Sequence, residues 1–253
     1  METVKQAGVV RERRTTPATV SASKSPWLVP LGLIALSLVP LAQGALRLSR
    51  LARGVPANAE SVRFVATPLP VVLHIVGATL FCVFGALQFA PTLREQRWHR
   101  FAGRLVVPAG LVAALSGLWM AFFYELPAGE DDPVLKVLRL VFGVGMVVAL
   151  VRGSLAILRR DFAAHRAWMM RGYAIGLGAG TQALIMVPWW LLFGKPIGPT
   201  RTLLMGAGWI VNLIVAERRW RPRSSVAPAH ARENARSRSG REGTAAYDAE
   251  RAN

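Results

Sequence analysis

Two short segments of this chain place a histidine beside an arginine at the edge of a long apolar run. The first contains His99-Arg100 and the second contains His165-Arg166, with further arginines on either side. Imidazole nitrogens can ligate metal ions and haem iron, and guanidinium groups form bidentate bonds to carboxylates and phosphates. These two segments are therefore the first candidates for a functional site.

Three roles fit the two segments. In the first, His99 and His165 lie at one depth of the membrane and are the axial ligands of a haem whose propionates the arginines hold. In the second, the arginines bind an anionic ligand or a lipid headgroup. The candidates for that role are Arg100, Arg104, Arg166 and Arg171. In the third, the basic segments only anchor the chain at a surface of anionic lipid.

His74 is a candidate of a different kind, because it lies about six residues inside an apolar run. An ionisable residue within a membrane helix is a functional candidate by default. At 100° per residue, Gly77 and Gly85 share the helix face of His74, so another helix or a flat cofactor could approach closely there. The alternative is that neutral His74 forms an interhelical hydrogen bond to a backbone carbonyl, to Ser116 or to Asn212.

Small residues also recur at helical spacing on two later apolar runs. They are Ala113, Gly117 and Ala121 on one run and Gly172, Gly176 and Gly180 on the other. Such faces indicate close helix packing more often than a cofactor slot, although a ring could enter between them.

The elements that carry these residues are membrane-length helices. The chain has 253 residues, 53% of them hydrophobic, and apolar runs of about 20 residues recur, which is the length that crosses a hydrocarbon core. We predict an all-α polytopic transmembrane bundle of about six spans. The predicted spans are 27–46, 68–90, 105–124, 134–157, 173–193 and 202–217. The bundle, residues 27–220, lies between two predicted disordered segments, 1–26 and the basic tail 221–253.

The net charge of +17 does not indicate nucleic-acid binding, because the cations flank the apolar runs or lie in the tails. This pattern predicts the lipid bilayer, with anionic lipids, as the partner. Near one side of the predicted spans lysine and arginine number 17, against 7 near the other. The termini are therefore predicted to be cytoplasmic and the protein to be a multi-pass protein of the bacterial inner (cell) membrane. One external segment runs against this rule, and it holds Arg47, Arg50, Arg53 and Arg63.

Several classes of chemistry lack their sequence signatures. Cys82 is the single cysteine, so neither an intramolecular disulfide nor a cysteine metal site can form, and no metal ligands are predicted. No phosphate-binding glycine loop, HExxH helix or serine elbow is present. The longest predicted loop has roughly 20 residues, too few for a soluble catalytic domain. The sequence assigns no catalytic residue, substrate or oligomeric state, and whether the protein is an enzyme stays open.

The chain resembles a bacterial membrane family catalogued as domain of unknown function 2306. The pieces that carry the resemblance are His74, Gly85, Gln88-Phe89, Arg94, Arg97, His99-Arg100, Gly103-Arg104, Asp161, His165-Arg166, Trp168-Met169, Arg171 and Tyr173. The resemblance covers about residues 65–215 and implies a multi-span helical protein of the bacterial inner membrane. No established activity comes with it, so it implies no catalytic roles.

Two functional hypotheses follow. The leading one is a haem-type redox or cofactor-binding membrane module that uses His74, His99 and His165. The alternative is an anion-binding or lipid-headgroup-binding protein, or a small transporter, that uses the arginine-rich cytoplasmic segments.

Overall fold

The computed structural model of the chain describes residues 27–56, 58, 61–94, 97–126 and 132–220, and these residues form helices, turns and short connections without strands. The predicted disordered segments 1–26 and 221–253 lie outside the described residues. The helices are α1 (Leu28–Ala52), α2 (Val62–Ala66), α3 (Pro68–Leu87), α4 (Pro91–Arg94), α5 (Arg97–Phe123), α6 (Pro133–Leu158), α7 (Phe162–Gly176), α8 (Gly178–Phe193) and α9 (Gly198–Trp220).

Six segments within the described residues are long and apolar enough to cross a membrane, with α7 and α8 together forming the fifth. The prediction of an all-α, six-span bundle is confirmed. Two helices begin before the spans predicted for them: α5 begins at Arg97, ahead of the predicted span 105–124, and α7 begins at Phe162, ahead of the predicted span 173–193. Arginine, tryptophan and histidine end an apolar run without ending a helix, because their backbones remain compatible with helical geometry.

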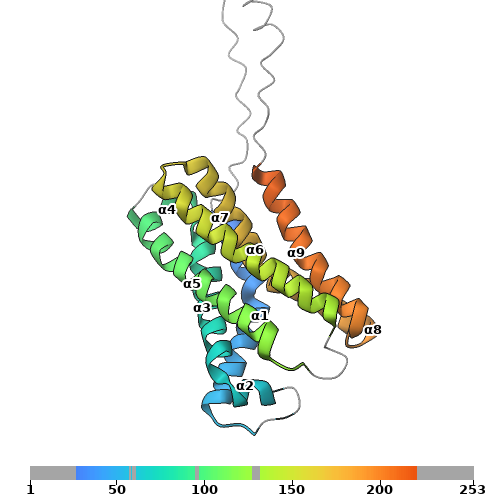
Figure 1. The fold of residues 1–253 in the computed structure, drawn as a ribbon. Helices are drawn as coiled ribbons and strands as arrows, with labels where there is room; N and C mark the ends of the chain where they lie inside the picture. The colour runs from blue at the N-terminus through green and yellow to red at the C-terminus, as the bar shows by residue number, and fades with distance from the viewer. Residues whose placement is uncertain (1–26, 57, 59–60, 95–96, 127–131, 221–253) are drawn as a thin grey trace, which may run out of the picture.

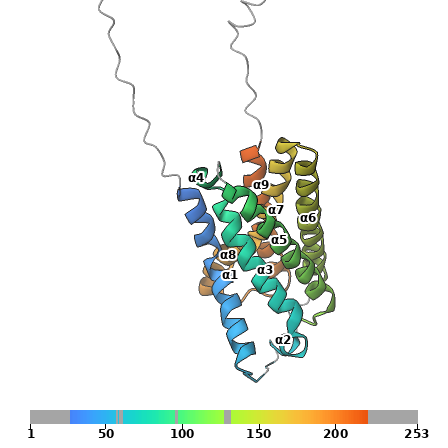
Figure 2. The ribbon, with the colours of Figure 1, turned by 90° about the vertical axis from the view of Figure 1, so that its left-hand side faces the viewer.

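The first residues of α1 and the last residues of α9 lie at the same end of the bundle (Figure 1). The short helix α4 lies at this end, which we call the terminal end. The short helix α2 lies at the opposite end, which we call the α2 end (Figure 2). An even number of crossings requires this arrangement.

Consecutive long helices pack as antiparallel pairs, α3 with α5 and α6 with α7, while α1 packs against α3 and α8. The core between them holds aromatic side chains. Phe81 of α3 is 1% exposed, and its ring centroid lies 5.5 Å from that of Tyr173 on α7. The Tyr173 hydroxyl donates to the Cys82 carbonyl at 2.8 Å, so a buried polar group that would be costly in lipid is satisfied.

The fifth span is interrupted at Leu177, between α7 and α8. A Cβ added to Gly178 would lie 2.3 Å from two atoms of the Trp209 ring on α9, so glycine lets that ring approach the break. Polar groups of α9 accompany it: Asn212 Nδ2 donates to the Ala174 carbonyl at 3.1 Å, and Thr181 Oγ1 donates to Asn212 Oδ1 at 2.7 Å. Interrupted membrane helices are tolerated where neighbours supply such bonds.

Reporter fusions will establish which way the bundle faces. We expect reporters inserted after Gly129 and after Gly198 to lie outside the cytoplasm, and reporters at residues 5 and 230 to lie inside, because cations are retained on the cytoplasmic side. Reporters that place the two termini on opposite sides would contradict six crossings. Reporters that exchange all four locations would contradict the predicted orientation alone.

Candidate functional site

His74 projects from α3 toward α5, and its hydrogen bond fixes the state of its ring. Its Nδ1 lies 2.8 Å from the carbonyl oxygen of Ala113. A carbonyl only accepts, so Nδ1 carries the proton and donates, and Nε2 keeps its lone pair. Gly117 makes room for the ring, because a Cβ there would lie 3.2 Å from both Cε1 and Nδ1 of His74.

This geometry confirms the interhelical hydrogen bond to a carbonyl that we gave as one role of His74. Ser116 Oγ lies 3.1 Å from the same Ala113 carbonyl and 2.6 Å from that of Val112, so it belongs to the same polar cluster rather than contacting the imidazole. Asn212, the other predicted partner of His74, instead donates a hydrogen bond to the Ala174 carbonyl near the break between α7 and α8.

The small residues near His74 are occupied by protein rather than open to a flat cofactor. A Cβ at Gly77 would lie 2.8 Å from the backbone oxygen of Ala109, so α3 and α5 touch there. A Cβ at Gly85 would lie 2.3 Å from the Tyr173 ring. Phe81 fills the space above Gly176, where a Cβ would lie 2.5 Å from its ring. These three glycines are therefore packed against protein, whereas Ala113, Gly117 and Ala121 of α5 line a cavity.

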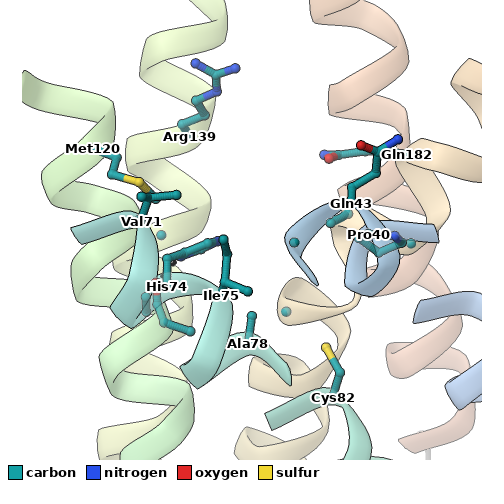
Figure 3. A pocket seen from close by; sticks show the side chains of 18 of the residues that line it. Pro40, Gln43, Val71, His74, Ile75, Ala78, Cys82, Met120, Arg139 and Gln182 are labelled. Carbon is teal, nitrogen blue, oxygen red and sulfur yellow. Dashed lines mark hydrogen bonds between the residues drawn. The ribbon is translucent and has the colours of Figure 1, made fainter. Parts of the chain in front are cut away.

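A cavity of about 720 Å³ lies beside His74, and its lining residues come from α1, α2, α3, α5, α6, α7, α8 and α9. We call it the central cavity. Figure 3 shows Val71, His74 and Ile75 of α3 on one side of it, with Gln43 of α1 and Gln182 of α8 across from them. Its volume lies within the range of small-molecule binding sites, which is about 300–1,000 Å³.

Most of the cavity wall is apolar, and much of it consists of flexible or aromatic side chains. These include Val71, Ile75, Phe81, Leu118, Met120, Phe142, Met146, Met186, Met205 and Trp209. The ring centroids of Phe142 and Trp209 stack at 4.7 Å. Gln182 is buried, and its Nε2 donates to the Met205 carbonyl at 2.9 Å, which leaves its Oε1 as an acceptor. A hydrocarbon chain or ring system would suit this wall.

Four arginines line the central cavity, each from a different helix: Arg47 of α1, Arg63 of α2, Arg139 of α6 and Arg201 of α9. No acidic residue is among the described residues that line it. Arg139 and His74 each lie six residues into their helices from the α2 end, which is about 9 Å at 1.5 Å per residue. The cationic groups therefore lie toward the α2 end.

Two of these arginines stack on the same aromatic ring. The guanidinium carbons of Arg47 and Arg63 lie 4.0 Å and 4.6 Å from the ring centroid of buried Phe64. Tyr124 packs edge-on against the same ring, with centroids 5.4 Å apart, and donates its hydroxyl to the Thr67 carbonyl at 2.5 Å. A ring face attracts a cation, so Phe64 helps to orient both guanidinium groups at the cavity.

Two ionisable groups at the α2 end lie outside the spans. Burial raises the pKa of Tyr124, so this phenol is neutral at physiological pH and does not offset the arginines. A hydrogen bond from the Thr202 hydroxyl lowers the pKa of Asp132, which also caps α6 by accepting from the Val134 amide at 2.9 Å. Asp132 thus links the starts of α6 and α9 and does not line the cavity.

His99 and His165 lie toward the terminal end, away from the central cavity lining. His165 Nδ1 lies 2.8 Å from the Gly153 carbonyl of α6, so Nε2 has the lone pair that an axial ligand needs. The His99 carbonyl accepts from Gln88 Nε2 of α3 at 3.4 Å. Each histidine segment thus bonds back to the preceding long helix. Joint ligation of a haem by the two imidazoles stays a prediction.

The four arginines predicted to bind anions differ in their surroundings. Arg171 forms a bidentate pair with Glu217 of α9, at 2.5 Å and 3.1 Å, and its guanidinium lies 4.9 Å from the Trp168 ring centroid. Its charge is already matched within the protein. Arg100 and Arg104 are exposed and line one shallow hollow on α5, and exposed Arg166 of α7 is not part of that hollow.

A helical bundle with six membrane-length segments and a ligand-sized cavity among them defines a polytopic integral membrane protein. The chain belongs to the family described as predicted membrane protein (DUF2306), which it matches over residues 71–220. The matched region begins within α3, so α1 and α2, with Arg47 and Arg63, lie outside it. No curated protein and no solved structure gives a significant match to the chain.

Proposed function

We propose that the protein binds an amphipathic anion in the central cavity, with the acidic head among the arginines and the apolar body against the wall near Phe81. The observation that supports this most strongly is the meeting of four arginines, from four helices, at a largely apolar cavity. Guanidinium groups bind carboxylates and phosphates through charge-assisted, often bidentate hydrogen bonds, so a cavity lined by four of them suits an acidic headgroup.

This proposal retains anion binding, which was the alternative hypothesis from the sequence. It places the binding site at the α2 end of the bundle rather than at the arginine-rich segments near His99 and His165. Arg47 and Arg63 belong to the predicted external segment whose cations run against the charge rule. The excess of lysine and arginine on the cytoplasmic side concerns membrane topology alone. A role in ligand binding accounts for the position of Arg47 and Arg63, because a site for an anion needs positive charge where the ligand enters. Arg50 and Arg53, from the same segment, do not line the cavity.

His74 Nε2 gives the cavity one further polar contact point. Because Nδ1 donates to the Ala113 carbonyl, Nε2 can only accept, so it suits a hydroxyl or amide donor on the ligand or a bound water. It does not compete with the arginines for an anionic head. The arginines are therefore expected to determine charge selectivity.

The proposal is tested by comparing a fluorescent C16 carboxylate with its methyl ester, using protein in nanodiscs of neutral lipid. We expect the carboxylate to bind more tightly than the ester. We expect the double variant Arg139→Gln/Arg201→Gln to weaken carboxylate binding at least about 100-fold, since each charge-assisted contact contributes about 1.5–3 kcal/mol. The affinity for the ester should change little.

The matched control is Arg50→Gln/Arg53→Gln, which removes the same charge from exposed positions near the same end of the bundle. This variant should bind the carboxylate as the unaltered protein does. Equal affinity for acid and ester, or equal losses in the two double variants, would contradict the proposal. A Soret band in the purified protein would favour the haem hypothesis instead.

A further inference from the structure

A second cationic site lies on α5 at the terminal end, far along the bundle from the arginines of the central cavity. Arg97, Arg100 and Arg104 follow one another at spacings of three and four, which places them on one face of the helix. Together with Phe101 they line a hollow of about 220 Å³. We call these four residues the α5 arginine face.

The positive charge of this face is not compensated by the described part of the chain. The first turn of α5 carries no acidic residue, and no described acidic side chain pairs with Arg97, Arg100 or Arg104. Glu95 lies outside the described residues. Like charges three and four residues apart on a helix repel one another, so the face is destabilising until an anion occupies it.

Two other arginines toward the same end have partners within the protein. Arg171 is paired with Glu217, and the guanidinium carbon of Arg152 lies 5.1 Å from the Trp168 ring centroid. These groups have a partner within the protein. Arg97, Arg100 and Arg104 have no such partner among the described residues, so an anion outside that part of the chain can occupy the face.

Phe101 indicates which kind of anion this is. Its side chain is 64% exposed and lies among the arginines, with its ring centroid 6.2 Å from that of Trp98. Aromatic side chains beside cations are typical of the membrane interface, where headgroups and the first methylenes of lipid chains meet. A free phosphate ion would gain nothing from an exposed phenylalanine, whereas a phospholipid presents both a phosphate and a chain.

We propose that the α5 arginine face binds the headgroup phosphate of an anionic phospholipid, with Phe101 against its acyl chains. This site shares no residue with the central cavity and does not depend on the function proposed for it. It narrows the predicted lipid contacts of the arginine-rich segments to one helix face.

The test is native mass spectrometry of the full chain, released from nanodiscs that contain phosphatidylglycerol and phosphatidylcholine. We expect the unaltered protein to retain one phosphatidylglycerol molecule selectively. Arg97→Gln/Arg100→Gln/Arg104→Gln should lose that molecule, and the milder Arg104→Gln should weaken its retention about tenfold. The single variant keeps the test decisive if the triple variant does not fold.

The control variant is Arg218→Gln/Arg219→Gln, which removes two exposed cations from the last turn of α9 at the same end. It should retain the lipid. Loss of lipid from this control to the same extent as from the α5 variants would overturn the proposal, since general surface charge would then explain retention.

Inorganic phosphate and Phe101→Ser separate a lipid from a free anion. We expect phosphate to compete only weakly with phosphatidylglycerol, and Phe101→Ser to weaken lipid retention without altering phosphate binding. Phosphate that binds as tightly as the lipid, together with no effect of Phe101→Ser, would overturn the assignment to a phospholipid.

Discussion

Replacing Gly180 with valine should give one of the two largest losses of stability predicted for this bundle. A Cβ at this position would lie 2.4 Å from the carbonyl oxygen of Leu36 and 3.0 Å from its carbonyl carbon, both in the backbone of α1. A backbone cannot rotate aside as a side chain can, so α1 must move away from α8. We expect a loss of about 3 kcal/mol or more in the free energy of unfolding.

The measurement is unfolding in mixed micelles, with ligand binding in nanodiscs as a second readout. Binding of the C16 carboxylate should fall as well, because α1 contributes Gln43 and Arg47 to the cavity. Gly32→Val is the control, since a Cβ at Gly32 has no atom within 4 Å. Similar losses for both variants would show that helix propensity, rather than contact between α1 and α8, explains the effect.

Replacing Phe81 with alanine should produce the second large effect. Phe81 is 1% exposed and packs into the spaces left by Gly110 of α5 and Gly176 of α7. Truncating a buried phenylalanine to alanine typically costs about 3–5 kcal/mol, because the emptied space collapses only in part. Since Phe81 also lines the central cavity, the variant should enlarge that cavity.

A double-mutant cycle with Gly176→Ala makes this prediction specific. In the unaltered protein the added Cβ would lie 2.5 Å from the Phe81 ring, so Gly176→Ala should be destabilising. In the Phe81→Ala background the same change should be neutral or stabilising, because the ring is gone. Additive effects would contradict the contact. Phe193→Ala, at a position 70% exposed, should cost little and controls for loss of apolar surface.

The spans were predictable because the thickness of the hydrocarbon core determines the length of an apolar run. The first turns of α5 and α7 could not be predicted in this way. There the apolar run begins only after several charged side chains, whereas the helix already includes them. For this reason His99 and His165 lie within helices rather than before them. Apolar runs indicate membrane depth, and capping and backbone bonds determine where a helix starts.

The helix face of His74 was predictable from periodicity, but its partner was one of several candidates. Its acceptor is the Ala113 carbonyl, and backbone carbonyls carry no sequence signal. Arg171 was predicted to bind an external anion, but its guanidinium forms an ion pair with Glu217, which lies 46 residues further along the chain. Pairing across that distance depends on how α7 packs against α9, which periodicity does not determine.

The central cavity had a signal in the sequence, namely the arginines of the predicted external segment that oppose the charge rule. The signal did not distinguish Arg47 and Arg63, which line the cavity, from Arg50 and Arg53, which do not. Stacking on Phe64 makes that distinction, and it requires α1 and α2 to lie together in space. Arg139 and Arg201 join them only through the tertiary fold.

The depth of Arg139 and His74 places the central cavity within the electric field of an energised membrane. Moving one elementary charge across the whole membrane corresponds to about 2.3 kcal/mol per 100 mV. With the α2 end outside, as predicted, an inside-negative potential draws the arginines inward and opposes the entry of an anion. A bound anion cancels part of the charge on which the field acts. Under the proposed function we therefore expect occupancy by an acidic ligand to depend on membrane voltage, and occupancy by a neutral one not to depend on it.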